Sequence, residues 1–549
     1  MNLRLPLSSL AALTVLACLA LPQSSRPQST APHTPADDFR TSGRCLTCHN
    51  NLKTARGEDV SIGIDWSASI MANSARDPYW QGSVRREALD HPESSAAIQN
   101  ACARCHAPLQ VLEDKAQSHA TEVFKYLPLA AAHDASAAAA DGVSCTVCHQ
   151  IQSIGLGTPA TGNGNFAVAA PGTQPRPLFG PYAPGSDNIT RVHVMASGYT
   201  VEQAAHIRDA ALCGSCHTLY TTSLGPGGEP AGRFPEQMTD LEWQQSSFRD
   251  KQTCQQCHMP AVGSPVAVAS LLGTPRDGVH RHTFTGANAL MQDMLSAHRD
   301  ELDVTAQAAS LAAASTRTIA FLQSQAARVT IGPARLAGAG LSFPVRVENL
   351  TGHKLPTSYP SRRAWLHVAV TGSAGRAVFE SGKLNADGSI AGNANDADPS
   401  RFSPHYTRIT APDQVQIFEP VLGDSEGHVT TGLLTATQYL KDNRILPAGF
   451  DKQSALPDVA VHGEAAADPE FTAGSSTTHY DLSTSGAAGP FHITVELIYQ
   501  PVGYRWERNL APYKADEPQR FVHYYDQAAA HSAVVLARAE ADVEAVGSQ

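Results

Sequence analysis

Hydrophobic and polar residues alternate in several short segments of the second half of the chain. A period of two is typical of β-strands with one buried face, and the Gly, Asn, Asp and Pro residues between the segments favour turns. The segments with strand character are residues 341–347, 364–370, 415–418 and 492–499. We therefore expect residues 328–549 to form an all-β, sandwich-like domain that is closed by a helix near residues 527–543.

The first half of the chain has no comparable periodicity. Residues 154–188 are dense in Gly and Pro and predict a long irregular loop, whereas the alanine-rich residues 130–140 favour a helix. Residues 301–327 are compatible with a helical connector between the two halves. The predicted fold class is a mainly α, loop-rich domain over residues 41–300, followed by the β domain.

The N-terminus has the pattern of an export signal. Arg4 precedes an apolar run over residues 5–21, which is short for a membrane span. We expect a signal peptide at residues 1–25 and a flexible leader at residues 26–40, with an uncleaved anchor as the alternative. Lipid attachment at Cys18 is disfavoured because Leu16 is a poor neighbour for that modification. No later stretch predicts a transmembrane span, so we expect an exported bacterial protein, either periplasmic or secreted to the cell surface.

Composition limits the function classes further. The chain has 549 residues and a formal net charge of −11, which leaves room for more than one core. No basic face suggests nucleic-acid binding. The acidic balance is compatible with redox partner proteins of opposite charge.

The strongest chemical signal is the motif Cys-x-x-Cys-His, which occurs five times and uses ten of the eleven cysteines. It is the attachment signature of c-type haem, in which two thiols bond to the porphyrin and the histidine binds the iron. Positions i, i+3 and i+4 share one face of a helical turn, so all three side chains meet the same macrocycle. A zinc or dithiol site is the alternative for a single motif, but zinc usually takes two motifs per metal. The sequence therefore predicts five c-type haems.

The residues that would hold these haems follow from the motifs. The predicted attachment cysteines are Cys45, Cys48, Cys102, Cys105, Cys145, Cys148, Cys213, Cys216, Cys254 and Cys257. The predicted proximal iron ligands are His49, His106, His149, His217 and His258. The intervals between motifs leave little room for a protein core, so the porphyrins themselves are expected to form it, lying close enough to pass electrons.

The sixth ligand of each iron decides what each haem does, because an open position admits substrate whereas two protein ligands suit electron transfer. Among the histidines outside the motifs we favour those that lie shortly before a motif or just after the last one. These candidates are His133, His193, His206 and His282. Met71 is a further candidate that would raise the potential of its haem, or else a core methionine.

Four segments resemble multihaem c-type cytochromes related to the tetrahaem cytochrome of ammonia oxidisers. They are residues 66–78, 141–150, 212–220 and 254–260, and the likeness covers most of residues 41–300. The resemblance implies an electron-transfer module more than any one substrate. Residues 351–365 are similar to a Thr-Gly-His-x-x-Pro-Thr element that follows the haem region in such proteins, which implies that His353 is a distal ligand donated by the β domain. A turn histidine is the alternative.

Two function classes remain open. The first is an electron carrier whose five irons are all six-coordinate. The second is a multihaem oxidoreductase in which one open haem acts on a small nitrogen or sulfur compound, such as hydroxylamine, nitrite or tetrathionate. Every motif ends in histidine, so the Cys-x-x-Cys-Lys variant of some nitrite reductases is absent from the sequence. A third, weaker possibility is a binding function of the β domain through Trp365, Tyr439, Tyr499 and Trp506, although aromatic residues in strands are more often core.

Overall fold

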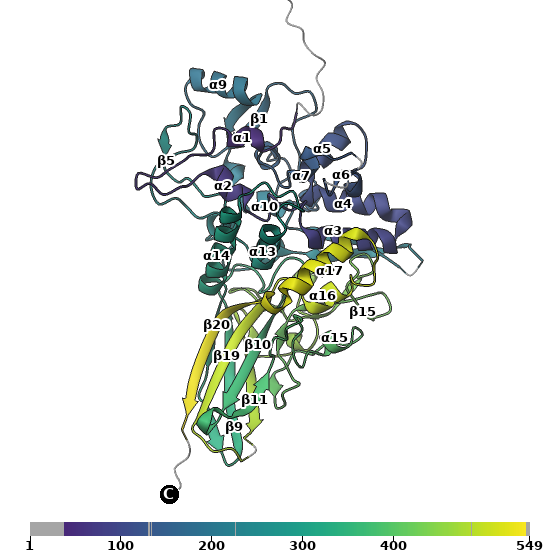
Figure 1. Ribbon diagram of the computed structural model, residues 1–549, viewed down its shortest axis with the longest axis vertical. Helices are drawn as coiled ribbons and strands as arrows, with labels where there is room; N and C mark the ends of the chain where they lie inside the picture. Colours follow the sequence, from purple (N-terminus) through teal and green to yellow (C-terminus); the bar gives the residue numbers. More distant parts are fainter. Residues whose placement is uncertain (1–37, 130–131, 133, 226, 485, 545–549) are drawn as a thin grey trace, which may run out of the picture.

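The structure is a computed structural model that describes residues 38–544, except residues 130, 131, 133, 226 and 485. The predicted signal peptide, Cys18, most of the leader and His133 lie outside the described residues. Helices gather in the upper part of Figure 1 and the long strands in the lower part. None of the helices in the described ranges has both the length and the apolar character of a membrane span.

Residues 38–326 form short helices joined by long irregular segments. The α-helices are α1 (Gly43–Leu46), α2 (Ile62–Ser67), α3 (Pro78–Asp90), α4 (Ser95–His106), α5 (Pro108–Ala116), α6 (Val123–Tyr126), α7 (Ala137–Ala140), α8 (Cys145–Gln150), α9 (Asp187–Ser197), α10 (Ala210–Gly214), α11 (Thr239–Gln244), α12 (Cys254–His258), α13 (Ala289–Ala297) and α14 (Ala308–Gln325). The 3₁₀ turns are η2 (Pro92–Ser94), η3 (Pro159–Thr161) and η4 (Ala205–Arg208). Every Cys-x-x-Cys-His motif overlaps a helix, as its spacing requires.

This part also contains strands that the sequence did not predict. They are β1 (Arg176–Gly180), β2 (Tyr199–Gln203), β3 (Leu219–Leu224), β4 (Pro230–Gln237), β5 (Val266–Ala267) and β6 (Pro275–Arg276). Strands β1 and β2 pair in parallel, whereas β3–β4 and β5–β6 are antiparallel hairpins. The prediction of a mainly α domain is therefore only partly supported, because backbone pairing replaces part of the expected loop over residues 154–188.

Helix α3, which borders the cavity described below, begins at a clear sequence signal. The carboxylate of Asp77 accepts hydrogen bonds from the backbone amides of Tyr79 and Trp80, at 2.8 and 3.1 Å, and Pro78 occupies the first turn. An N-terminal aspartate cap followed by proline is a strong helix start. The helix consequently presents Trp80, Val84 and Glu87, which are buried, on successive turns of one face.

Residues 327–544 form mostly strands. They are β7 (Ala327–Ile331), β8 (Arg335–Ala337), β9 (Gly340–Asn349), β10 (Arg363–Thr371), β11 (Ala377–Ser381), β12 (Arg408–Ile409), β13 (Ile417–Phe418), β14 (Pro420–Gly423), β15 (Val429–Thr430), β16 (Gln438–Asp442), β17 (Phe471–Thr472), β18 (Ser475–Ser483), β19 (Phe491–Gln500) and β20 (Val534–Val543). The helical pieces are α15 (Ala394–Ala397), α16 (Tyr504–Arg508), α17 (Asp516–Ala528), η5 (Ser373–Gly375), η6 (Pro457–Val459), η7 (Glu464–Ala466) and η8 (Ala529–His531). Three of the segments predicted as strands are confirmed at β9, β10 and β19, and the fourth, residues 415–418, is a strand only at β13.

Two larger sheets share one hydrophobic core. The first has the strand order β11-β10-β19-β20, with β13 beside β10, and the second has β12-β18-β9-β7, with β17 and β8 at its sides. Val345 and Val347 of β9 meet Val368 of β10 and Val495 of β19 in this core, and all four are fully buried. Burying an aliphatic side chain of this size contributes about 1.5–3 kcal/mol. A third sheet has the order β15-β14-β16.

The predicted helix at residues 527–543 is wrong in most of its length. The helix lies earlier, as α17, and residues 534–543 form β20, which pairs antiparallel with β19. Arg538, Glu540 and Asp542 are exposed and alternate with alanines, which is the period of a strand. The alanine content favoured a helix, but pairing with β19 outweighs that propensity.

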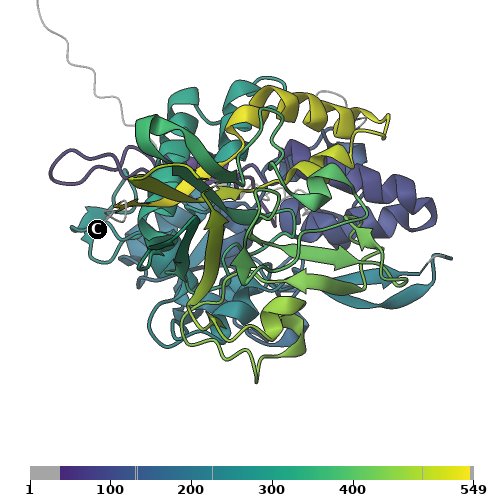
Figure 2. The same ribbon diagram turned by 90° about the horizontal axis from the view of Figure 1, so that it is seen from below.

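Helix α17 lies along α3 and joins the two parts of the molecule, as both views show (Figure 1, Figure 2). The Arg85 guanidinium of α3 donates two hydrogen bonds of 2.8 Å to the carboxylate of Glu517 of α17. The ring of Tyr79 packs against Phe521, with centroids 4.8 Å apart. A bidentate pair with apolar packing beside it fixes the orientation of the two parts.

Candidate haem-binding site

All ten motif cysteines and all five motif histidines line a single cavity of about 2200 Å³. A site for one small molecule occupies roughly 300–1,000 Å³, so this cavity has room for several large ligands. None of the ten cysteines forms a disulfide, so every thiol is available for attachment. The thiols, the imidazoles and the volume of the cavity therefore fit several c-type haems side by side.

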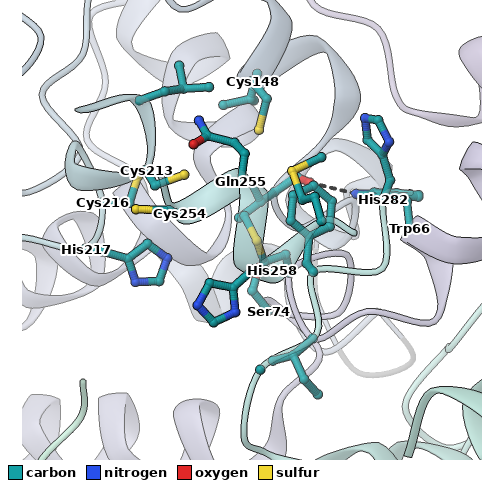
Figure 3. A pocket seen from close by; sticks show the side chains of 18 of the residues that line it. Trp66, Ser74, Cys148, Cys213, Cys216, His217, Cys254, Gln255, His258 and His282 are labelled. Carbon is teal, nitrogen blue, oxygen red and sulfur yellow. Dashed lines mark hydrogen bonds between the residues drawn. The ribbon is translucent and has the colours of Figure 1, made fainter. Parts of the chain in front are cut away.

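Contacts between cysteines show which motifs are neighbours. The thiols of three pairs lie close enough to shift each other's pKa: Cys45 and Cys145, Cys105 and Cys216, and Cys213 and Cys254. Cys148 also lies close enough to Cys216 for their charges to interact. Figure 3 shows Cys213, Cys216 and Cys254 together, with the rings of His217 and His258 nearby. The fourth motif thus borders the second, third and fifth, whereas the first motif borders the third.

Four of the motif histidines share one orientation. In each, ring nitrogen Nδ1 lies within hydrogen-bond distance of a backbone carbonyl. The pairs are His49 with Val268 (2.6 Å), His106 with Ser74 (3.0 Å), His149 with Phe179 (2.7 Å) and His258 with Thr285 (2.6 Å). A carbonyl that accepts from Nδ1–H fixes the tautomer and leaves Nε2 free to bind a metal.

Two histidines outside the motifs face motif histidines across the cavity. The rings of His149 and His282 are nearly parallel, 18° apart, with centroids separated by 6.5 Å. The rings of His258 and His353 are 12° apart, with a separation of 6.4 Å. Two imidazoles on opposite sides of one metal, with metal–nitrogen bonds of roughly 2 Å, have centroids about 6 Å apart. Nδ1 of His282 contacts the carbonyl of His280 at 3.2 Å, and Nδ1 of His353 contacts that of Lys354 at 2.9 Å.

His193 shares with His282 and His353 a contact between Nδ1 and a backbone carbonyl. Its Nδ1 lies 3.1 Å from the carbonyl of Tyr199, and its side chain lines the cavity. Its charge is among those that lower the pKa of His49. His193 sits on α9, which packs against β2, the partner strand of β1.

The other predicted distal candidates are placed differently. His206 does not line the cavity, and its Nε2 lies 2.8 Å from the carbonyl of Ile151, so the nitrogen that usually binds a metal is engaged elsewhere. Met71 lines the cavity and stays a candidate ligand.

Burial keeps the facing imidazoles neutral. Burial lowers the pKa of His149 and of His258. It lowers the pKa of His282 to about 3. The pKa falls to about 4 in His106, His217 and His353. Neutral imidazole is the form that binds a metal, so no proton competes at neutral pH.

A buried network of charges, which no sequence pattern predicted, supports His353. The ammonium of Lys354 lies 2.6 Å from the carboxylate of Asp442, which also accepts two hydrogen bonds of 2.8 Å from Arg444. Arg444 pairs at 2.9 Å with Glu242 of α11, whose other oxygen accepts from the Lys354 amide at 3.1 Å. All four residues are nearly inaccessible to solvent. The network ties the segment carrying His353 to both parts of the chain.

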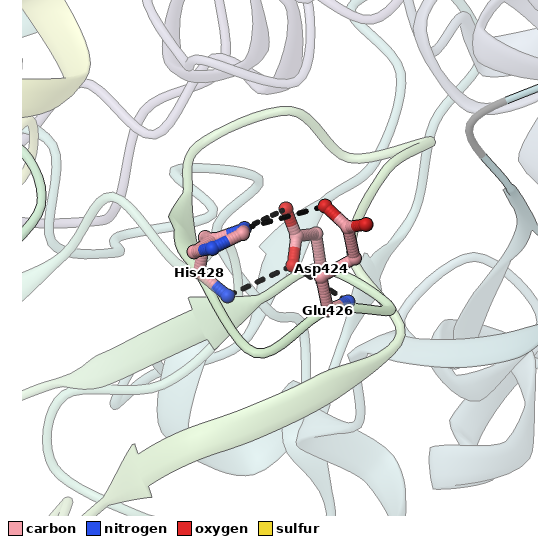
Figure 4. A group of neighbouring side chains, drawn as sticks. All are labelled: Asp424, Glu426 and His428. Atoms are coloured by element: carbon pink, nitrogen blue, oxygen red, sulfur yellow. Dashed lines mark hydrogen bonds and ion pairs between the residues drawn. The ribbon is translucent and has the colours of Figure 1, made fainter.

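Burial or local turn geometry accounts for two other groups of candidate residues. Trp365 and Tyr499 are 0% and 1% exposed, so neither belongs to an open binding face. Asp424, Glu426 and His428 form a group of possible metal ligands on the turn between β14 and β15 (Figure 4). The Asp424 carboxylate accepts from the backbone amides of the other two residues, so local turn geometry accounts for this group.

No family model matches the chain, and no curated protein matches it significantly. Among solved structures it is similar to a penta-haem cytochrome c552 from Thermochromatium tepidum, with a TM-score of 0.49 and 17% identity over 92% of this chain and 100% of that chain. This likeness is too weak to transfer a function.

Proposed function

We propose that the protein carries five covalently bound c-type haems outside the cytoplasm and relays electrons between redox partner proteins. The observation that carries this proposal is the single cavity that all fifteen motif side chains line. Each porphyrin is bonded at its edge to its cysteines, so contacting cysteines of different motifs bring porphyrin edges together. Bound haems supply reversible one-electron chemistry, and the cysteine contacts make the five sites one continuous path.

We further propose the axial ligands of three irons from the facing imidazoles. His149 with His282 and His258 with His353 follow from the ring separations. His49 with His193 follows from their proximity and their shared hydrogen-bond pattern. Each of these six histidines has Nδ1 next to a carbonyl, which orients Nε2 toward the iron. His206 is not part of this set.

Replacing His353 by alanine tests the proposed interdomain ligand. We expect the H353A variant to keep five attached haems, because no attachment cysteine changes, but one iron in five becomes high-spin. Low-temperature electron paramagnetic resonance of the oxidised protein measures the high-spin fraction. H206A is the matched control, and its spectrum should equal that of the wild type because His206 lies outside the cavity. A high-spin fraction in H353A equal to that of the wild type would exclude His353 as a ligand.

A second candidate function is chemistry on a small nitrogen or sulfur compound at one open haem. One observation favours it. Among the described residues, no second histidine ring faces His106 or His217 at the separation of the two stacked pairs, and the ring stacked on His106 is that of Trp80, at 4.5 Å. Exogenous ligands can reach an iron only where the sixth position is open.

A further inference from the structure

A group of polar aromatic and acidic side chains forms one end of the cavity. We call it the tyrosine chamber and define it by Tyr79 and Glu87 of α3, Glu236 of β4, and Tyr359 and Arg362 of the segment before β10; all five line the cavity. The chamber therefore combines residues from both parts of the molecule. The rings of Tyr79 and Tyr359 are perpendicular, with centroids 5.7 Å apart.

The chamber lies beside the second haem-attachment motif. The charges of Glu236 and Glu87 both act on the Cys102 thiol and, with burial, raise its pKa, so both carboxyl groups are close to it. Trp80, one turn before Val84 and two before Glu87 on α3, stacks on the ring of His106. The haem bound to this motif would thus have α3 as a shared wall with the chamber.

The two carboxyl groups are held as potential proton donors. Glu236 is 4% exposed and accepts from the Thr221 hydroxyl and, at 3.3 Å, from the Gln237 amide. Glu87 is equally buried and accepts from the backbone amides of Leu433 and Leu434, at 2.8 and 3.4 Å. Burial raises the pKa of Glu236 to about 7, so a proton on this carboxyl is available near neutral pH.

The remaining polar groups present donors that lack an acceptor. Arg362, a permanent cation with donors only, makes one hydrogen bond of 3.2 Å to the Thr357 carbonyl, which leaves donors of its guanidinium free. Tyr499 is 1% exposed, lines the same cavity, and its hydroxyl has no hydrogen-bond partner. The charge of Arg362 also reaches Tyr499 and His217, so these groups surround one space. An unpartnered buried hydroxyl indicates a missing acceptor, which either a carboxylate of the bound haem or a free oxyanion would supply.

We propose that the tyrosine chamber binds a small oxyanion beside the haem of Cys102 and Cys105, an inference that rests on the proposed haem attachment. A small oxyanion offers only acceptors, which matches the guanidinium, the phenols and a protonated carboxyl group. Its charge pairs with Arg362. The tyrosine chamber lies beside one of the five proposed haems, so electrons delivered by the other haems can reach the bound oxyanion. The chamber is therefore the substrate site of the second candidate function.

Nitrite titration of the purified protein, with its haem content determined first, tests the proposal. In the wild type we expect a high-spin signal that includes the iron bound by His106, and a saturable change of that signal and of the visible spectrum on adding sodium nitrite. R362Q should raise the Kd for nitrite about tenfold or more, because it removes a charged hydrogen-bond donor. Y359F, which removes the hydroxyl but keeps the ring and its packing, should also raise the Kd for nitrite.

R276Q is the matched control, because Arg276 lines the same cavity but stacks on Tyr182, 5.2 Å from that ring, away from the chamber. Its nitrite Kd should equal that of the wild type. Absence of a high-spin iron in the wild type, or an unchanged Kd in both R362Q and Y359F, would overturn the chamber proposal while five reducible haems keep the electron-transfer proposal intact. A haem content below five would instead contradict the proposed function itself.

Discussion

Replacing Asp442 by asparagine is expected to lower the free energy of unfolding by about 3–5 kcal/mol, because it leaves Lys354 and Arg444 buried without their shared counter-ion. The midpoint of denaturant unfolding, followed by haem absorbance, measures the loss. Since Lys354 follows His353 directly, the variant should also gain high-spin iron at room temperature. Removing one partner of a buried charge network costs more than an exposed ion pair contributes.

D300N is the control for this prediction. Asp300 pairs with Arg299 at 3.0 Å, but its side chain is 91% exposed, so the free energy of unfolding should change by no more than about 0.5 kcal/mol. Equal stabilities of D442N and the wild type would show that the network is not formed.

The pH dependence of stability should report the same network. Burial alone would raise the pKa of Asp442, but the charges of Arg444 and Lys354 outweigh it and hold this pKa well below its usual range. A depressed folded-state pKa contributes stability that is present above the unfolded value of about 4 and is lost as the pH falls through the folded value. The stability difference between the wild type and D442N should therefore be full at neutral pH and narrow progressively below about pH 4.

Replacing both cysteines of the fourth motif should interrupt the electron path. The C213A/C216A variant is expected to hold four haems instead of five. Because this motif borders three others through Cys148, Cys105 and Cys254, its loss separates the second and fifth haems from the first and third. Stopped-flow reduction should then show a slowly reduced fraction that the wild type lacks.

The C45A/C48A variant is the matched control, because it also removes one haem. The first motif lies at the end of the proposed row of haems, since among the described motif cysteines Cys45 interacts with Cys145 of the third motif alone. The four remaining haems of C45A/C48A should be reduced in a single fast phase. Identical kinetics in the two double variants would contradict the order of haems that the cysteine contacts indicate.

The main strands could be predicted because they depend on local spacing, and the haem attachment, which rests on a pattern of the same kind, stays a prediction. Cysteine and histidine at i, i+3 and i+4 define a haem motif by themselves, and alternation over 492–499 is enough to predict β19. Alanine-rich residues 534–543 misled the prediction because their alternation with charged residues carries more weight than helix propensity.

Long-range arrangements could not be predicted in this way. His193 and His206 both lie shortly before the fourth motif, and only the cavity and the hydrogen bonds of their ring nitrogens distinguish them. The charge network joins residues that lie about 200 positions apart in the sequence, such as Glu242 and Arg444. The tyrosine chamber likewise gathers side chains from α3, β4 and the segment before β10.

The number of electrons that each chain takes up tests the central claim most directly. Coulometric reduction of the purified, fully oxidised protein, followed through the haem absorbance, should require five electrons per chain and should reverse completely on reoxidation. An uptake below five electrons, or a fraction of haem that cannot be reduced through the array, would contradict five connected haems.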